Sequence, residues 1–108
     1  MRKNLFDFTN CTAAVIGGSS GLGRVITEAL VNANCRVVIG SRNESKLFAT
    51  KDEINNDTQS DRCIAFPVNV DSEDSIKNFT SHIAETFDGK LNIVVFSARI
   101  NILYLIEK

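Results

Sequence analysis

The sequence predicts an α/β fold in which helices cover both faces of a doubly wound parallel sheet. Short apolar runs rich in β-branched residues alternate with segments whose apolar residues recur every three or four positions. The resulting order, strand-helix-strand-helix-strand-helix-strand, requires parallel strands joined by right-handed crossovers. We therefore expect about four strands in the order 3-2-1-4 and about three helices.

The first half of the chain supplies two strands and two helices. Residues 12–16 form an apolar run that ends at glycines, and residues 35–39 form a second run that Gly40 closes. Asn43 is a suitable N-cap for the second helix, which should end before a polar loop at residues 55–61. The apolar face predicted for the first helix is Leu22, Val25, Ile26, Ala29, Leu30 and Ala33. The thinner face of the second is Leu47, Phe48 and Ile54.

The second half continues the alternation. Residues 63–68 read as a third strand, and Pro67 places it at an edge or near a strand end because proline donates no ladder hydrogen bond. Asp71 is the expected N-cap of a third helix, which Asp88-Gly89 should end. Residues 91–96 read as the fourth strand. The apolar face of the third helix is Ile76, Phe79, Ile83, Ala84 and Phe87.

Bulk composition excludes several classes of partner. The chain has 108 residues, a formal net charge of −1 and 12 Lys and Arg residues scattered along its length. Nucleic-acid and anionic-membrane surfaces need clustered positive charge, so we expect neither partner. No apolar stretch approaches the roughly 20 residues that span a bilayer, and the N-terminus lacks a signal-peptide pattern. We therefore expect a cytoplasmic protein.

The cysteines and the single histidine do not indicate a metal site. Cys11, Cys35 and Cys63 are odd in number and too widely spaced for a disulfide framework or a zinc pattern. We expect buried thiols in a reducing compartment. His82 falls beside the apolar face of the third helix, which predicts a half-exposed surface histidine.

A glycine-rich loop, residues 17–23, lies between the first strand and the first helix. A phosphate needs several backbone N–H groups pointing at it with no side chains in the way, and glycine permits that approach. A helix that begins near Leu22 adds unpaired N–H groups and the positive end of its dipole. The hydroxyls of Ser19 and Ser20 can donate to the same anion. This loop is therefore predicted to bind a phosphate; a plain turn is the alternative.

Two common phosphate-binding motifs do not fit the loop. A P-loop would place lysine where Arg24 stands and Ser or Thr where Val25 stands. The Gly-x-Gly-x-x-Gly spacing is also absent. Instead, the glycines fall at Gly17, Gly21 and Gly23.

That spacing resembles the short-chain dehydrogenase/reductase family, whose loop reads Thr-Gly-x-x-x-Gly-x-Gly. Ile16 replaces the usual threonine. The resemblance extends from Leu5 to about Val95, which is the first half of a typical member. It implies a Rossmann-type fold lacking its C-terminal half, and a bound NADP or NAD whose diphosphate lies on Gly17, Ser19, Ser20, Gly21, Leu22 and Gly23.

The end of the second strand favours NADP over NAD. NAD enzymes place an acidic residue there for the ribose 2′-hydroxyl, whereas an arginine nearby accommodates a 2′-phosphate. Ser41 stands at the acidic position with Arg42 beside it. The alternative is that Arg42 is an ordinary exposed residue. The family's Asp-Val pair near the adenine is replaced here by Asn69-Val70.

Residues 97–108 depart from the family and form an atypical tail. The family's Asn-Asn-Ala-Gly after the fourth strand is replaced by 96–99, with Arg99 in place of glycine on the nicotinamide side. Residues 91–96 are expected to form a sheet edge, and the apolar part of the tail can fold back over the uncovered apolar face beside it.

The family's catalytic Ser and Tyr-x-x-x-Lys lie beyond a further helix and strand, and we assign no catalytic residue here. Tyr104 and Lys108 have the four-residue spacing but follow the fourth strand directly. The interpretation is one truncated NADP(H)-binding domain, residues 1–108, from an oxidoreductase of the carbonyl reductase or alcohol dehydrogenase class that lacks hydride transfer. Alternatives are an inactive nucleotide-binding or interaction module, which pairs with itself or with a full-length homologue, and a non-functional gene fragment.

Overall fold

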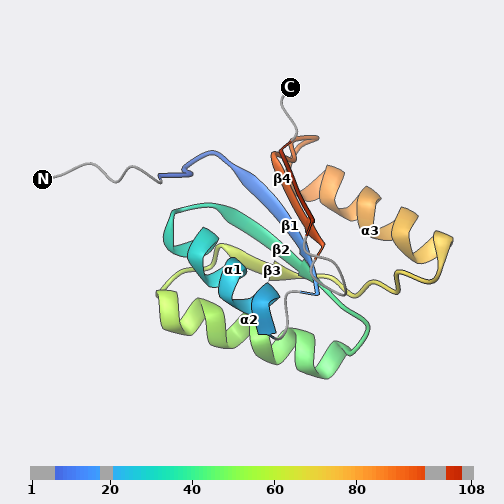
Figure 1. The fold of residues 1–108 in the computed structure, drawn as a ribbon, viewed down its shortest axis with the longest axis horizontal. Helices are drawn as coiled ribbons and strands as arrows, with labels where there is room; N and C mark the ends of the chain where they lie inside the picture. The colour runs from blue at the N-terminus through green and yellow to red at the C-terminus, as the bar shows by residue number, and fades with distance from the viewer. Residues whose placement is uncertain (1–6, 18–20, 97–101, 106–108) are drawn as a thin grey trace, which may run out of the picture.

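A computed structural model describes residues 7–17, 21–96 and the backbone of 102–105. Strands and helices alternate in the predicted order, and one further strand follows them (Figure 1). The elements are β1 (Thr12–Ile16), α1 (Gly21–Asn32), β2 (Arg36–Gly40), α2 (Glu44–Thr58), β3 (Cys63–Ala65), α3 (Glu73–Thr86), β4 (Ile93–Phe96) and β5 (Ile102–Leu105).

The described strands form one sheet in the order β3-β2-β1-β4-β5. The first four are parallel, which confirms the predicted 3-2-1-4 arrangement. The tail adds β5, which runs antiparallel to β4 with Phe96 opposite Ile102 and Ile93 opposite Leu105. The expected sheet edge at residues 91–96 is therefore wrong: the tail pairs with β4 as a strand, and β5 forms the edge of the described sheet.

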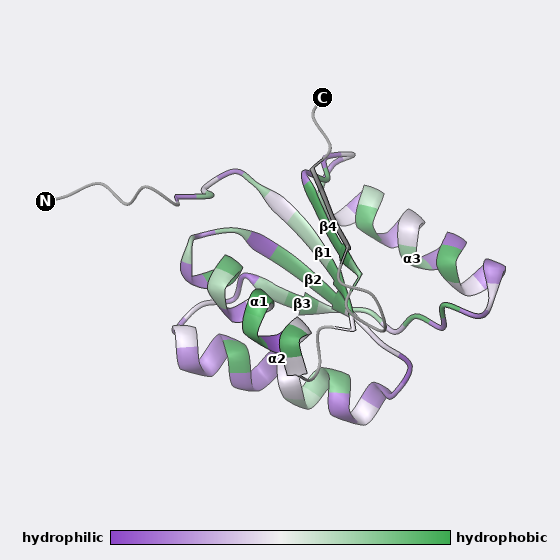
Figure 2. Ribbon diagram, in the orientation of Figure 1, coloured by the Kyte–Doolittle hydropathy of each residue, from purple (hydrophilic) through white to green (hydrophobic). Residues whose placement is uncertain are grey.

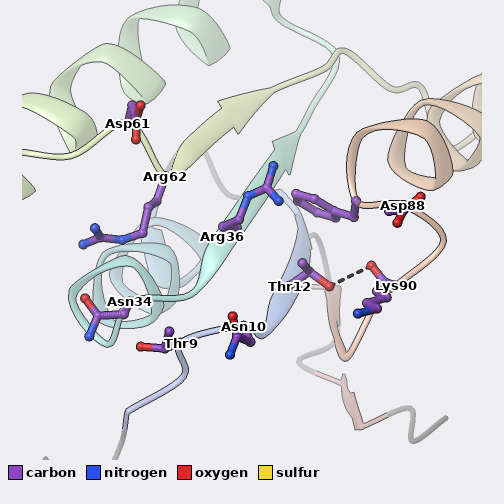
Figure 3. A pocket seen from close by; sticks show the side chains of 10 residues that line it. Thr9, Asn10, Thr12, Asn34, Arg36, Asp61, Arg62, Asp88 and Lys90 are labelled. Atoms are coloured by element: carbon purple, nitrogen blue, oxygen red, sulfur yellow. Dashed lines mark hydrogen bonds between the residues drawn. The ribbon is translucent and has the colours of Figure 1, made fainter.

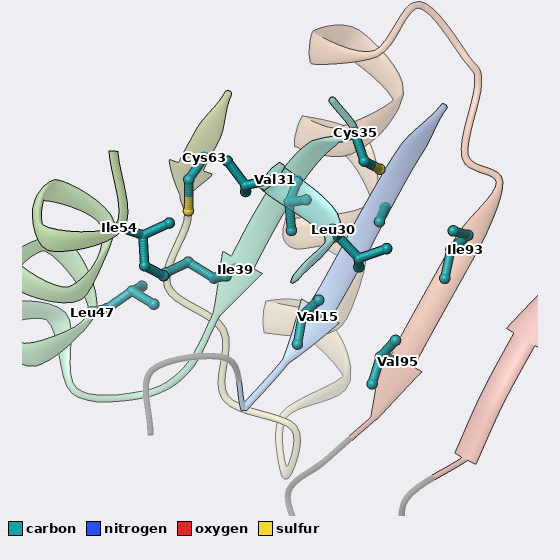
Figure 4. Close-up of a cluster of buried hydrophobic side chains, with 12 residues drawn as sticks. Val15, Leu30, Val31, Cys35, Ile39, Leu47, Ile54, Cys63, Ile93 and Val95 are labelled. Carbon is teal, nitrogen blue, oxygen red and sulfur yellow. The ribbon is translucent and has the colours of Figure 1, made fainter. Parts of the chain in front are cut away.

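Helices α1 and α2 pack on one face of the sheet and α3 packs on the other (Figure 1). Figure 2 shows the consequence in hydropathy, with apolar residues concentrated along the strands and polar residues on the outer side of α2. The larger core lies under α1 and α2 (Figure 4). Its buried members are Ala13, Val15, Leu30, Val31, Cys35, Val37, Ile39, Leu47, Ile54, Cys63, Ile93 and Val95.

The face covered by α3 has a smaller core, because α3 is the only described helix that packs there. Its buried members are Ala14, Val38, Val68, Phe79, Ile83 and Phe87. Gly40 is needed at this face, since a Cβ on it would come within 2.8 Å of both Phe79 and Val68. The predicted apolar face of α3 is confirmed at Phe79, Ile83 and Phe87, whereas Ile76 and Ala84 are exposed.

The predicted apolar face of α1 is confirmed at Leu30 and Ala33, which are buried, and at Ile26, which packs against the core. It is wrong at Leu22 and Val25, which are 48% and 62% exposed, and at Ala29, and it left out the buried Gly23, Thr27 and Val31. Thr27 can be buried because its hydroxyl donates to the Gly23 carbonyl at 2.8 Å. Gly23, with no side chain, lets the helix approach the sheet closely.

Helix α2 runs to Thr58, so the predicted loop at residues 55–61 is wrong over its first half. Asn55 is not a loop residue but a link to the edge strand. Its Oδ1 accepts from the Cys63 N–H at 3.0 Å, and its Nδ2 donates to the Cys63 carbonyl at 2.8 Å. Strand β3 ends at Ala65 rather than 68, and its position at the sheet edge agrees with Pro67.

Helix caps agree with the sequence at one position and differ at another. Asn43 caps α2 as predicted, with its Oδ1 accepting from the Lys46 N–H at 3.1 Å. The N-cap of α3 is Ser72 rather than Asp71, because the Ser72 hydroxyl accepts from the Ser75 N–H at 3.2 Å. Asp88 and Gly89, at φ 57° and 76°, follow the end of α3 as predicted.

The cysteines and His82 have structural environments. Cys35 and Cys63 are buried free thiols, and burial raises the pKa of each to about 12. Cys11 is half-buried. His82 is half-exposed and stacks on Phe66, with ring centroids 4.0 Å apart. Among the described residues no cluster could hold a metal ion, and none of their helices has the length and apolar character needed to cross a membrane.

Candidate cofactor-binding site

The chain segments that leave β1, β2 and β3 meet at the carboxyl edge of the sheet. The Gly17 N–H donates to the Gly40 carbonyl at 2.7 Å, and the Val68 N–H donates to the Ser41 carbonyl at 3.0 Å. These bonds extend the strand pairing past the ends of the strands and hold the three turns side by side. Ligands of open α/β sheets bind outside this edge, where the strand order reverses, which here is between β1 and β4.

The glycine loop has the backbone geometry that a phosphate site needs. Gly17 and Gly21 have φ angles of 89° and 57°, which glycine adopts without strain. A Cβ placed on Gly21 would meet no atom of the described residues within 4 Å, so none of them fills the space over the start of α1. Helix α1 begins at Gly21, one residue before the predicted start, and its first turn carries no acidic side chain. Its N-terminus is therefore available to an anion.

The phosphate contacts predicted for three residues of the loop remain predictions. Ser19 and Ser20 lie outside the described residues, so their hydroxyls remain predicted donors. Leu22 lies in the first turn of α1 with its side chain half exposed, and only its backbone N–H is expected to face a phosphate.

Arg24 is held away from the glycine loop. Its Nε lies 3.1 Å from a Glu28 oxygen, and its Nη1 lies 2.7 Å from a Glu53 oxygen. These contacts raise the pKa of the Arg24 guanidinium and join α1 to α2. Arg24 therefore contributes to helix packing rather than to phosphate binding.

An open hollow of about 360 Å³ lies beside the glycine loop. It is lined by Ile16, Gly17, Ser41, Arg42, Asn43, Lys46, Val68 and Val70. Four of the predicted site residues, Gly17, Ser41, Arg42 and Val70, thus surround one space. Its lining combines apolar side chains with two basic residues, Arg42 and Lys46, which suits a nucleoside that carries a phosphate.

Asn69 lies next to this hollow rather than in its wall. Its Oδ1 accepts from the Asp71 N–H at 3.0 Å, and its backbone N–H donates to the Ser75 hydroxyl at 2.8 Å. It lines a second hollow of about 260 Å³ on the other side of Arg42. Asn69 therefore shapes the turn before α3, and contact with an adenine remains a prediction.

Lys46 is a candidate site residue that the sequence analysis missed. It lies in the first turn of α2, four residues after Arg42, and lines the same hollow. Asn43 could have indicated it. Because Asn43 was predicted to cap α2, Lys46 was expected in the first turn of that helix, and this end of the helix faces the carboxyl edge. The Arg42 side chain is 70% exposed, and its Nη1 lies 3.8 Å from a carboxylate oxygen of Asp71.

A larger hollow of about 590 Å³ lies at the opposite edge of the sheet (Figure 3). Two of the basic side chains that line it, Arg62 and Arg36, make contacts within the protein. The Arg62 Nη2 donates to the Val31 carbonyl at 2.8 Å, and the Arg36 guanidinium lies 5.1 Å from the centroid of the Phe87 ring. Thr12 donates to the Lys90 carbonyl at 2.7 Å. The carboxyl edge is therefore the candidate cofactor site.

A family model described as short chain dehydrogenase matches residues 11–107. The chain belongs to the short chain dehydrogenase family. A tropinone reductase homolog of Arabidopsis thaliana is 34% identical over 87 residues, which is 81% of this chain and 32% of the relative. A 3beta-hydroxysteroid dehydrogenase of Eggerthella lenta is 30% identical over 98 residues, or 89% of this chain and 36% of the relative.

Solved structures of the family superpose on the same region. A Pseudomonas aeruginosa RhlG/NADP complex matches with a TM-score of 0.77 at 29% identity, covering 86% of this chain and 36% of that one. Actinorhodin polyketide ketoreductase with NADPH matches with a TM-score of 0.75 at 25% identity, covering 82% and 33%. This short chain dehydrogenase sequence thus spans about a third of the length of the relatives it matches.

The described residues contain no arrangement like the Tyr-x-x-x-Lys pair of short chain dehydrogenases. Tyr104 lies in β5, opposite Val94, and not on a helix. The four-residue spacing to Lys108 is meaningful only on a helix face, and Lys108 lies outside the described residues. Residues 97–99, where Arg99 replaces the family's glycine, also lie outside them.

Proposed function

We propose that this chain binds NADP(H) as the cofactor-binding part of a short-chain oxidoreductase of the carbonyl reductase or alcohol dehydrogenase class. The observation that carries the proposal is the hollow at the end of β2, where Ser41 stands in the acidic position of NAD enzymes and two cations, Arg42 and Lys46, are grouped. The NADP and NADPH complexes of similar structures support the same cofactor.

Each group of residues has a place in this proposal. The start of α1, with Gly17 and Gly21, would receive the diphosphate, and Val70 would line the space for the nucleoside. Arg42 offers a planar pair of donors to a 2′-phosphate, and Lys46 adds a second positive charge. When bound, the nicotinamide supplies or accepts a hydride. The fit is supported by the space over Gly21, which no described residue fills, and by the two basic residues that line the hollow.

We expect the 108-residue polypeptide to bind NADPH without turning it over. Tyr104 lies in a strand, and no other described side chain supplies the tyrosine that would act as general acid or base. NADPH titration followed by fluorescence tests binding, and loss of NADPH absorbance with a panel of carbonyl compounds tests turnover. Tyr104→Phe should change neither result. Turnover that disappears in Tyr104→Phe would contradict this proposal.

The NADPH titration separates a cofactor-binding chain from the fragment alternative, and the carbonyl panel separates an active enzyme from an inert chain. Binding of NADPH without turnover fits both the proposal above and an inactive nucleotide-binding or interaction module, and the position of Tyr104 favours this outcome. A chain that binds neither NADPH nor NADH matches the fragment alternative. The free thiols of Cys35 and Cys63 suit the reducing cytoplasm that we propose as the compartment.

We also propose that the isolated 108-residue chain self-associates, with a second copy of itself as the partner. An apolar groove of about 250 Å³ lies between α3 and β4, and Ile76 on its rim is 43% exposed. The neighbouring β5 is an edge strand, and an identical edge strand can satisfy its backbone groups directly. A full-length homologue is the alternative partner.

Ile76→Glu should shift the chain toward monomer in size-exclusion chromatography with light scattering. Val25→Glu is the matched control, because Val25 is 62% exposed on α1, which packs on the other face of the sheet. A parent chain that is monomeric at all concentrations tested would contradict the proposal, as would equal effects of the two variants.

A further inference from the structure

A carboxylate stands next to the arginine that would select the cofactor. Arg42 follows β2, and Asp71 lies in the turn between β3 and α3, so the two residues come from separate segments that meet at the carboxyl edge. Their side chains approach to 3.8 Å between the Arg42 Nη1 and the Asp71 Oδ2, and both are largely exposed, at 70% and 80%. Arg42 lines the hollow that Lys46 also lines.

Within the described part of the chain, no contact of Asp71 other than its ion pair with Arg42 requires a charged side chain. The N-cap of α3 is Ser72, and the contact that Asp71 makes in its turn is through its backbone, whose N–H donates to the Asn69 Oδ1 at 3.0 Å. An asparagine at position 71 would keep both features. The distinct consequence of the carboxylate is therefore its hold on Arg42.

The two cations at the hollow are in different situations. Arg42 is paired with Asp71, whereas Lys46 makes no ion pair within the described part of the chain. A 2′-phosphate that binds Arg42 competes with the Asp71 carboxylate for the guanidinium, whereas NADH, which lacks this phosphate, does not. The cost of separating the pair therefore falls on NADPH alone.

We propose that Asp71 is a specificity-determining residue that weakens the preference for NADPH by competing with the 2′-phosphate for Arg42. This inference rests on the proposed NADP(H) site. It makes Asp71 a positioning residue: it acts through the guanidinium of Arg42 and does not touch the cofactor. Exchange of this one carboxylate should then sharpen cofactor selection without any change in the glycine loop.

Asp71→Asn should strengthen NADPH binding by about two- to fivefold, the range expected for an exposed ion pair, and leave NADH binding unchanged. The gain should shrink at high salt, since the pair is open to solvent. Asp74→Asn is the matched control: it removes the same charge three residues away, in the first turn of α3, from a residue without an ion pair in the described chain. It should leave the ratio of NADPH to NADH affinity unchanged.

The gain from Asp71→Asn should disappear when Arg42 is alanine. A gain of the same size in the Arg42→Ala background would show that Asp71 repels the phosphate directly, and would overturn the inference. An unchanged affinity ratio in Asp71→Asn, or equal gains in Asp74→Asn, would also overturn it. A parent chain with no preference for NADPH over NADH would instead contradict the proposed function, so the two failures are distinguishable.

Discussion

Gly21→Val should abolish NADPH binding while most of the helix content remains. Gly21 has a φ of 57°, a conformation that a β-branched residue rarely adopts, and it opens α1. The added side chain would project into the open space over the helix N-terminus, where a diphosphate must approach the backbone N–H groups. NADPH titration and circular dichroism, measured on the same samples, test the two halves of this expectation.

Gly89→Val is the matched control for the backbone cost. Gly89 has a φ of 76°, a Cβ on it would meet nothing within 4 Å, and it follows α3 at the opposite edge of the sheet. The two substitutions therefore impose similar strain at different places. Binding by Gly21→Val that is as tight as that of the parent would show the loop assignment to be wrong. Equal losses of NADPH binding in both variants would show that the effect arises from reduced stability of the fold.

The fold was predictable because its signals are local and mutually consistent. The runs at β1, β2 and β4 are apolar on both sides, as buried parallel strands require, and each is followed by a glycine or a polar turn. Handedness and connection rules then leave few arrangements of such units. The strand β5 follows no family pattern, and its pairing with β4 could be foreseen only as a possibility because it depends on a tertiary contact.

The errors in the sequence analysis have a common physical origin. Periodicity counts apolar residues, so it assigned Val25 to the core of α1 and left out Thr27. The structure buries Thr27 because a backbone carbonyl within the helix satisfies its hydroxyl. Asn55 was assigned to a loop for the same reason, although its amide pairs with β3. Polar residues with specific partners are those that composition misplaces.

The residues of the candidate site also divide into those that sequence position predicts and those whose place depends on packing. Gly17, Ser41 and Arg42 could be predicted because they follow strands closely, and Gly21 because it begins the helix after β1, so sequence position alone places them at the carboxyl edge. Lys46 and Asp71 were missed because their relation to Arg42 depends on how α2 and the turn before α3 are packed. The sequence therefore predicts a ligand class for the edge, and the structure adds two charged residues, Lys46 and Asp71, close to Arg42.

Arg42→Ala should weaken NADPH binding by roughly tenfold or more and leave NADH binding nearly unchanged. Loss of a charged phosphate partner typically costs about 1.5–3 kcal/mol, which corresponds to roughly ten- to a hundredfold in affinity. The lower part of that range applies here, because Arg42 is 70% exposed and Lys46 remains beside the hollow. Titration of both cofactors against the parent and the variant gives the affinity ratio directly.

Arg36→Ala controls for the loss of one positive charge near the other end of β2. Arg36 begins β2 at the opposite edge, where its guanidinium lies over the Phe87 ring. Long-range electrostatic attraction of an anionic cofactor would weaken similarly in both variants, whereas direct contact with a 2′-phosphate would be lost only with Arg42. Equal losses of NADPH and NADH in Arg42→Ala would assign Arg42 to the fold. A selective loss of NADPH, absent from Arg36→Ala, would locate cofactor discrimination at the end of β2.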